Sequence, residues 1–164
     1  MKTIILTFAA TALLFAQAPS MNPWTHKLDF GNPAIQADQA RYRMIGSIIG
    51  ANMNSTADQA ITVAAPIGTS RKYIVRRVIV VNASTSLTLA VGGVYSAASK
   101  GGSAIVANTQ VYTALTAAAK FLDLTLAAIA LSDVRTEATL YLSLTTAQGG
   151  AATADLYIFA EDIS

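Results

Sequence analysis

Of all segments in this sequence, Arg71–Asn82 predicts a single conformation most strongly, and that conformation is a β-strand. It is rich in β-branched and aromatic residues, it follows the turn-forming sequence of residues 66–70, and it stops at an asparagine. Side chains alternate between the two faces of a strand, and here both faces are mostly apolar. We therefore expect a central strand covered on both sides, as in a β-sandwich.

Two consecutive arginines, Arg76 and Arg77, interrupt this run. In a regular strand they would lie on opposite faces, so at least one guanidinium would enter a covered layer and need a carboxylate, a carbonyl or a neighbouring molecule. The alternative is a long stem that carries the charge to the rim. We expect an acid such as Asp123 or Asp155 as the partner, and Arg77→Ala as the more damaging substitution, since the face of Arg77 is the more apolar one.

Short apolar or alternating segments separated by turns continue to residue 160. Besides the strand at 71–82, strands are predicted at residues 41–49, 60–65, 86–91, 104–106, 120–127, 138–145 and 154–160. Their spacing and the lack of any sustained helix predict an all-β domain over residues 41–164, an antiparallel β-sandwich or jelly roll of about eight strands. Gly92-Gly93 is expected to end one strand, and the last two strands are expected to form a hairpin.

Residues 1–40 are predicted to be a hydrophobic N-terminal arm and an extended connector. Met1-Lys2, an apolar stretch to Phe15 and then Ala16-Gln17-Ala18 have the form of a secretory signal, although Pro19 would follow the cleaved bond. Thirteen apolar residues cover about 20 Å of helix against a hydrocarbon core of about 30 Å, so no stable membrane insertion is expected. Three interpretations of this segment stay open. It is an arm that docks on a neighbouring subunit, a signal peptide that is cleaved off, or a membrane anchor.

The connector carries Trp24 and Phe30, aromatic side chains expected to plug into a surface groove. Together with the arm and the paired arginines they make up the predicted subunit-interface residues. These are Ile4, Ile5, Leu6, Leu13, Leu14, Phe15, Trp24, Phe30, Arg76 and Arg77.

The composition suggests a protein that works in an assembly. Charged residues make up 12 % of the chain, about half of the roughly 25 % usual in soluble domains. Residues 1–100 hold nine Lys or Arg against three Asp, and residues 101–164 hold two against six acids, so the halves carry +6 and −4. Such an imbalance arises either by chance or because subunits meet basic side to acidic side.

Residues for chemistry are almost absent from the sequence. There is no cysteine, no phosphate-binding glycine loop before a helix and no GxSxG motif, and His26 has no partner at ligand spacing. Asp133 and Glu137 flank Arg135 and are interpreted as a solvated pair rather than a cation site. No catalytic residue, metal or cofactor is predicted. The basic pairs lack an aromatic stacking platform, so no direct contact with nucleic acid is expected.

Several segments resemble small virion structural proteins of tailed bacteriophages. They are RKYIVRRVIVVNASTSLTLA at 71–90, GGVYSAASKGG at 92–102, VYTALTAAAKFLDLTL at 111–126 and LYLSLTTAQGGAATADLYIFAEDIS at 140–164. The resemblance covers roughly Ile61 to the C-terminus and carries over no functional residue. It implies an oligomeric β-sandwich that coats or joins parts of a particle.

The function expected from this resemblance is that of a non-enzymatic virion subunit, a capsid decoration or cement protein. Its partners would be other copies of itself, as a trimer or another homo-oligomer, and virion proteins such as the major capsid protein. A tail or fibre-associated virion protein is one alternative. The other is an exported bacterial β-sandwich, a secreted or cell-surface binding module whose signal peptide is removed.

Overall fold

The computed structural model describes residues 20–21, 28–29, 41–64 and 71–163. The chain divides into two units, residues 1–36 and 37–164, which we describe separately. In the first unit, β1 (Ser20–Met21) and β2 (Leu28–Asp29) pair in an antiparallel arrangement. The predicted interface residues of the arm and connector all lie outside the described residues. They are Ile4, Ile5, Leu6, Leu13, Leu14, Phe15, Trp24 and Phe30.

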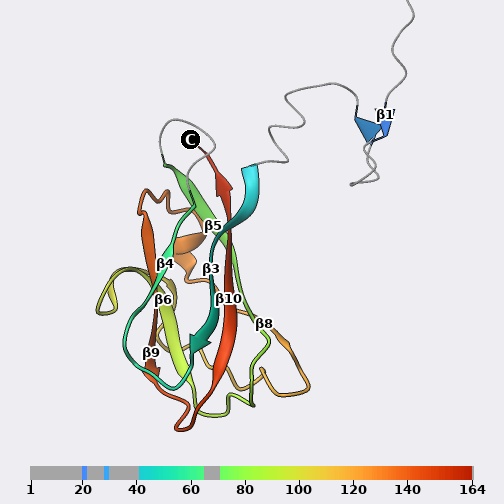
Figure 1. Cartoon of the computed structure of the whole chain (residues 1–164). Coiled ribbons are helices and arrows are strands. Elements are labelled where there is room, and N and C mark those ends of the chain that lie inside the picture. The colour runs from blue at the N-terminus through green and yellow to red at the C-terminus, as the bar shows by residue number, and fades with distance from the viewer. Residues whose placement is uncertain (1–19, 22–27, 30–40, 65–70, 164) are drawn as a thin grey trace, which may run out of the picture. The chain divides into compact units, whose positions relative to one another are not determined.

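The second unit is a β-sandwich, as the sequence predicts. Its elements are β3 (Tyr42–Asn52), β4 (Gln59–Thr62), β5 (Tyr73–Val81), β6 (Val91–Ala97), β7 (Gly101–Val106), β8 (Phe121–Asp123), the 3-10 helix η1 (Ala128–Leu131), β9 (Thr139–Thr146) and β10 (Thr153–Asp162). Two four-stranded antiparallel sheets, ordered β3-β10-β5-β8 and β4-β9-β6-β7, face each other (Figure 1).

The core is an aliphatic layer between the two sheets. Strict alternation places Leu140, Leu142 and Leu144 of β9 on one side of this layer and Leu156 and Ile158 of β10 on the other, all at 0–1 % exposure. Burying one such side chain is worth about 1.5–3 kcal/mol, so this layer is the main source of stability. The strands predicted at 138–145 and 154–160 are confirmed.

Each open side of the sandwich is closed by the chain itself. On one side the amide of Ala64 donates to the carbonyl of Ile45 in β3 over 2.7 Å. On the opposite side the amide of Ala127 donates to Ile105 in β7 over 2.8 Å, and Val106 bridges to Leu126. The segment that contains η1 therefore covers the gap between β5 and β7.

The predicted hairpin of the last two strands is wrong. β9 pairs with β4 and β6 in one sheet, whereas β10 pairs with β3 and β5 in the other. Both strands bury alternate residues in the same core, from opposite sides, so their hydrophobic patterns fit a hairpin and a sheet-to-sheet connection equally well. The loop between them spans the gap of about 10 Å that separates packed sheets.

Gly92 and Gly93 do not end a strand but lie inside β6, and the predicted strand at 86–91 is wrong except for its last residue. The chain needs glycine here because neighbouring strands approach closely. A Cβ on Gly93 would lie 2.1 Å from the carbonyl oxygen of Val106, and one on Gly92 would lie 2.4 Å from the Cα of Leu144.

We predict that Gly93→Ala lowers the free energy of unfolding by about 3 kcal/mol, at the upper end of the range for overpacking. The methyl group would collide with backbone atoms, which cannot move aside as a side chain can. Gly150→Ala is the matched control, since no atom lies within 4 Å of its added Cβ. Urea unfolding of both variants checks the prediction, and equal stability of the two would contradict it.

Candidate interaction surface

The surface of the β3-β10-β5-β8 sheet that points away from the core, here called the outer face, is partly apolar. Tyr157 and Phe159 of β10 are half-buried there, between the neighbouring strands. On β3, Tyr42, Met44 and Ile49 are 50, 47 and 67 % exposed. Among the described residues β5 is thus covered on its inner face only, and none of them provides the predicted cover on its other face. An aromatic and aliphatic sheet face of this kind is typical of a protein-binding surface.

A β-bulge in β5 decides where the two arginines point. Phe159 of β10 lies opposite Arg77 and Ala160 lies opposite Val75, so Arg76 has no residue of its own on the partner strand. One extra residue in a strand turns the following side chains to the other face. The bulge therefore resets the alternation of β5 at the position of the arginine pair.

This reset corrects the prediction for Arg76 and Arg77. Inward positions are Tyr73 and Val75 before the bulge and Val78 and Val80 after it. Both arginines point outward, with side chains 38 and 45 % exposed, and no guanidinium enters the core from this strand. The bulge avoids the cost of burying a charge.

Both arginines form ion pairs on the outer face. Arg77 donates from Nε to Oδ2 of Asp123 over 2.8 Å, and its guanidinium carbon lies 5.5 Å from the centre of the Phe121 ring. The expected pairing with Asp123 is confirmed. Arg76 donates to Oε2 of Glu161 over 2.7 and 3.0 Å, and to the carbonyl of Leu131 over 2.6 Å. Arg77 thus ties β8 to β5, and Arg76 ties η1 to the same strand.

Aromatic stacking stabilises the outer face near β3. The rings of Tyr42 and Phe159 are 6.2 Å apart between centres and inclined by 17°. Such pairs contribute about 0.5–1.5 kcal/mol beyond their buried area. Asp155, the other acid expected to pair with an arginine, instead accepts from the amide of Gly50 and the side chain of Asn82.

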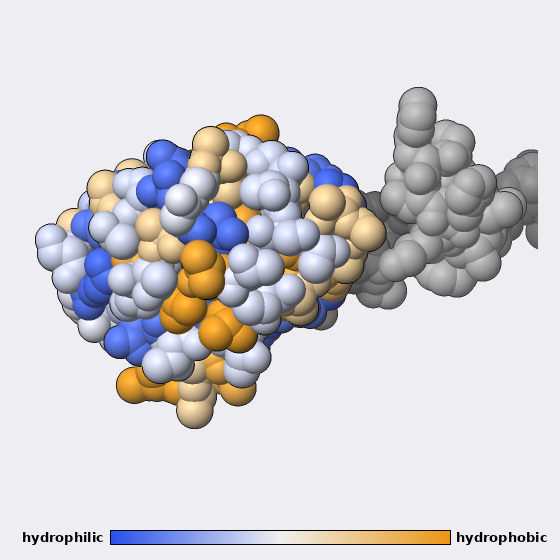
Figure 2. Space-filling view, turned by 90° about the horizontal axis from the view of Figure 1, so that it is seen from below, coloured by the Kyte–Doolittle hydropathy of each residue, from blue (hydrophilic) through white to orange (hydrophobic). Residues whose placement is uncertain are grey.

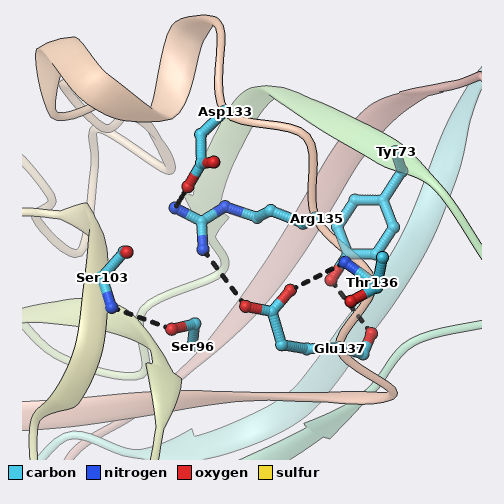
Figure 3. Close-up of polar contacts among 7 residues, drawn as sticks. All are labelled: Tyr73, Ser96, Ser103, Asp133, Arg135, Thr136 and Glu137. Atoms are coloured by element: carbon cyan, nitrogen blue, oxygen red, sulfur yellow. Dashed lines mark hydrogen bonds and ion pairs between the residues drawn. The ribbon is translucent and has the colours of Figure 1, made fainter.

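Arg135 is, with Asp162, one of two buried charged residues in the described part of the chain, and its side chain is 1 % exposed (Figure 3). Its Nη2 lies 3.1 Å from Oδ2 of Asp133, and its Nη1 lies 3.6 Å from Oε1 of Glu137. The interpretation of these acids as a solvated pair is therefore wrong. The guanidinium fills the space between the carboxylates, which could otherwise have attracted a cation.

The backbone around Arg135 is fixed as firmly as its side chain. Its amide and carbonyl both pair with Tyr73, over 2.8 and 3.0 Å. The hydroxyl of Tyr73 donates to the carbonyl of Glu137 over 3.1 Å, and burial raises the pKa of this phenol. Arg135 thus anchors the segment after η1 to the first residue of β5.

Sequence reasoning missed Arg135 and the aromatic pair of the outer face. The signal for Arg135 was its spacing, because residues 133, 135 and 137 point the same way in an extended chain. Alternation places Phe159 on the face opposite Ile158, but nothing in the sequence indicates that its partner is Tyr42. In both cases the alternation of the strand indicates which way the side chain points, but not which residue it contacts.

Figure 2 shows the end of this unit seen from below. Hydrophobic residues (orange) lie there in separate groups among hydrophilic ones.

The described residues contain no cluster of three His, Cys, Asp or Glu that could hold a metal ion. No helix among them is long and apolar enough to cross a membrane. Searches of protein-family models, curated proteins and solved structures gave no match for this chain.

We predict that Arg135→Ala lowers the free energy of unfolding by about 2–5 kcal/mol, because it removes one of the largest fully buried side chains and leaves a cavity. Arg76→Ala and Arg77→Ala should each cost about 0–1 kcal/mol, because their ion pairs are exposed. This replaces the expectation that Arg77→Ala is severe. Urea unfolding of the three variants tests the ranking, which a loss at Arg77 as large as that at Arg135 would refute.

Proposed function

We propose that this protein is a non-enzymatic structural subunit of a bacteriophage virion, in its most specific form a capsid decoration or cement protein. The outer face is the observation that carries the proposal. It presents exposed Tyr42, Met44 and Ile49 on a strand that is paired along its length with β10. A rigid apolar surface of this kind gains free energy when a partner covers it, without first having to be ordered.

The sequence supports the same role independently. Only 12 % of the residues are charged, so the chain has few side chains that could keep a large exposed surface solvated. The segments at 71–90 and 140–164 also resemble tailed-phage virion proteins. A decoration protein acts by bridging neighbours in a shell, so it needs a stiff body and apolar contact surfaces. Its partners would be copies of itself and the major capsid protein, and its location the virion.

Two alternatives use the same surface differently. A tail or fibre-associated subunit would bind another virion protein through the outer face. An exported bacterial surface module would lack residues 1–18 and bind a partner outside the cell. The position of the protein in a particle separates the first alternative from a decoration role, and its N-terminus separates the second.

The test of the virion role is binding to particles that lack the protein. We expect wild-type protein to bind and to raise the temperature at which the particles release DNA. Met44→Asp and Ile49→Asp place a charge on the outer face and should weaken binding at least tenfold, which is about 1.4 kcal/mol. Ala60→Asp, an exposed position on the opposite sheet, is the control and should bind normally.

Failure of wild-type protein to bind, together with its absence from purified virions, would refute the virion role. Equal binding by all three variants would refute the outer face as the contact surface.

The state of the N-terminus gives a separate prediction. We expect the native protein to keep residues 1–20, with Ile4, Ile5, Leu6, Leu13, Leu14 and Phe15 in contact with another chain. The apolar stretch is too short to span a bilayer as a helix and precedes Pro19. Peptide mapping of protein from its natural source decides the matter, because a first residue at Pro19 would identify a cleaved signal instead.

A further inference from the structure

The turn between β6 and β7 adopts a conformation that its own sequence does not favour. The amide of Gly101 donates to the carbonyl of Ala98 over 3.0 Å, which closes a tight turn around Ser99 and Lys100. Both of these central residues have positive φ, 57° and 59°. Hairpin turns with this geometry are usually built from glycine, asparagine or aspartate, because a Cβ crowds the backbone in the left-handed region. A contact from outside the turn is therefore needed to hold it in place.

The strand pairing next to the turn is irregular and gives it little support. The register between β6 and β7 shifts twice between Val94 and Ala97. Below the turn, the amide of Ser103 donates to the hydroxyl of Ser96 over 2.9 Å and fixes the two strands there. We call residues 97–102 the hairpin tip. Its two central side chains are exposed, so no packing holds them.

A carboxylate from a distant part of the chain supplies the contact. Oδ2 of Asp58 accepts a hydrogen bond from the amide of Ser99, 41 residues further along the chain. Asp58 directly precedes β4, and in the sheet order β4-β9-β6-β7 this strand lies at the opposite edge from β7. The bond therefore ties the hairpin tip to the far side of its own sheet.

The position of Asp58 is itself fixed by the connection between β3 and β4. The side chain of the next residue, Gln59, accepts from the amide of Asn52 over 2.7 Å and donates to the carbonyl of the same residue over 2.9 Å. The left-handed residues lie on the other side of the bond, in the hairpin tip. Of the two segments that the bond joins, the tip is therefore the one that moves when the bond is lost.

The contact depends on the charge of Asp58. The pKa of Asp58 is lowered from its ordinary value, first by the hydrogen bond from the Ser99 amide and then by the hydroxyl of Ser143, whereas burial acts in the opposite direction. Lys100 on the tip lowers this pKa as well. Asp58 is the only charged residue in the segment 44–70, so no other charge of its own element competes with these groups.

We propose that Asp58 is a charge-dependent latch, which holds the hairpin tip in its left-handed conformation and releases it when the carboxylate charge is lost, while the rest of the sandwich stays folded. This inference is independent of the virion role. A carboxyl group with a lowered pKa contributes fully to folding above its ordinary pKa, and the contribution is lost as the pH falls through the folded-state value. Acid therefore releases the tip at a pH below the ordinary pKa of 3.8.

NMR spectroscopy of the isotope-labelled full-length protein tests the latch. We expect the amide proton of Ser99 to titrate with a midpoint below pH 3.8. In the same range the backbone order parameters of the hairpin tip should fall from about 0.85 to below about 0.6, and those of β9 should stay high. An amide that does not titrate, a tip that keeps its order, or a simultaneous loss of order in β9 would overturn the proposal.

Variants test the latch at neutral pH. Asp58→Ala should release the tip, whereas Asp123→Ala, which removes a carboxylate that binds Arg77 on the other sheet, should leave the tip ordered. Ser99→Asn together with Lys100→Gly supplies residues that favour the turn, so adding both to Asp58→Ala should restore an ordered tip. An ordered tip in Asp58→Ala alone, or a released tip in the triple variant, would contradict the latch.

Discussion

The structure depends on keeping charge out of the aliphatic layer between its two sheets. An unpaired guanidinium in that layer would cost several times the gain from a buried leucine. In β5 the bulge at Arg76 meets this requirement, because it keeps Val75 and Val78 inward on either side of two consecutive arginines. The arginines that the core excludes then hold β8 and η1 in place, so the arrangement of the outer face follows from a constraint on the inner one.

Arg135 shows the other solution to the same constraint. It is buried, but two carboxylates accompany it and its backbone pairs with Tyr73 in both directions. Its contacts are ionic rather than aligned hydrogen bonds. A buried pair of this kind contributes more to a defined geometry than to net stability. In this domain the geometry that it defines is the path of the chain from η1 into β9.

The sequence predicted those features that depend on alternation within a single strand. The inward leucines of β9, the pattern of β10 and the outward Asp123 follow from a period of two, and so does the sandwich fold. The bulge did not, because its signal is a register with a strand far along the chain. Gly92 and Gly93 were misinterpreted for a related reason, since a glycine that ends a strand and one that allows a close neighbour look alike in sequence. The assignment of β9 and β10 to different sheets likewise depends on long-range partners.

The central place of β10 in its sheet has a consequence for how the chain is made. β10 lies between β3 and β5 and is the last of the three in sequence, and the ion pair Arg43–Asp162 joins positions 119 residues apart. Neither β3 nor β5 can complete its pairing before residues up to Asp162 have left the ribosome. Pairing in this sheet is therefore of high contact order, which favours slow folding. Until β10 has been synthesised, β3 and β5 expose the backbone hydrogen-bonding groups that will later pair with it. Such unpaired strand edges can pair with another chain, so a cell that makes many copies must keep the nascent chains apart.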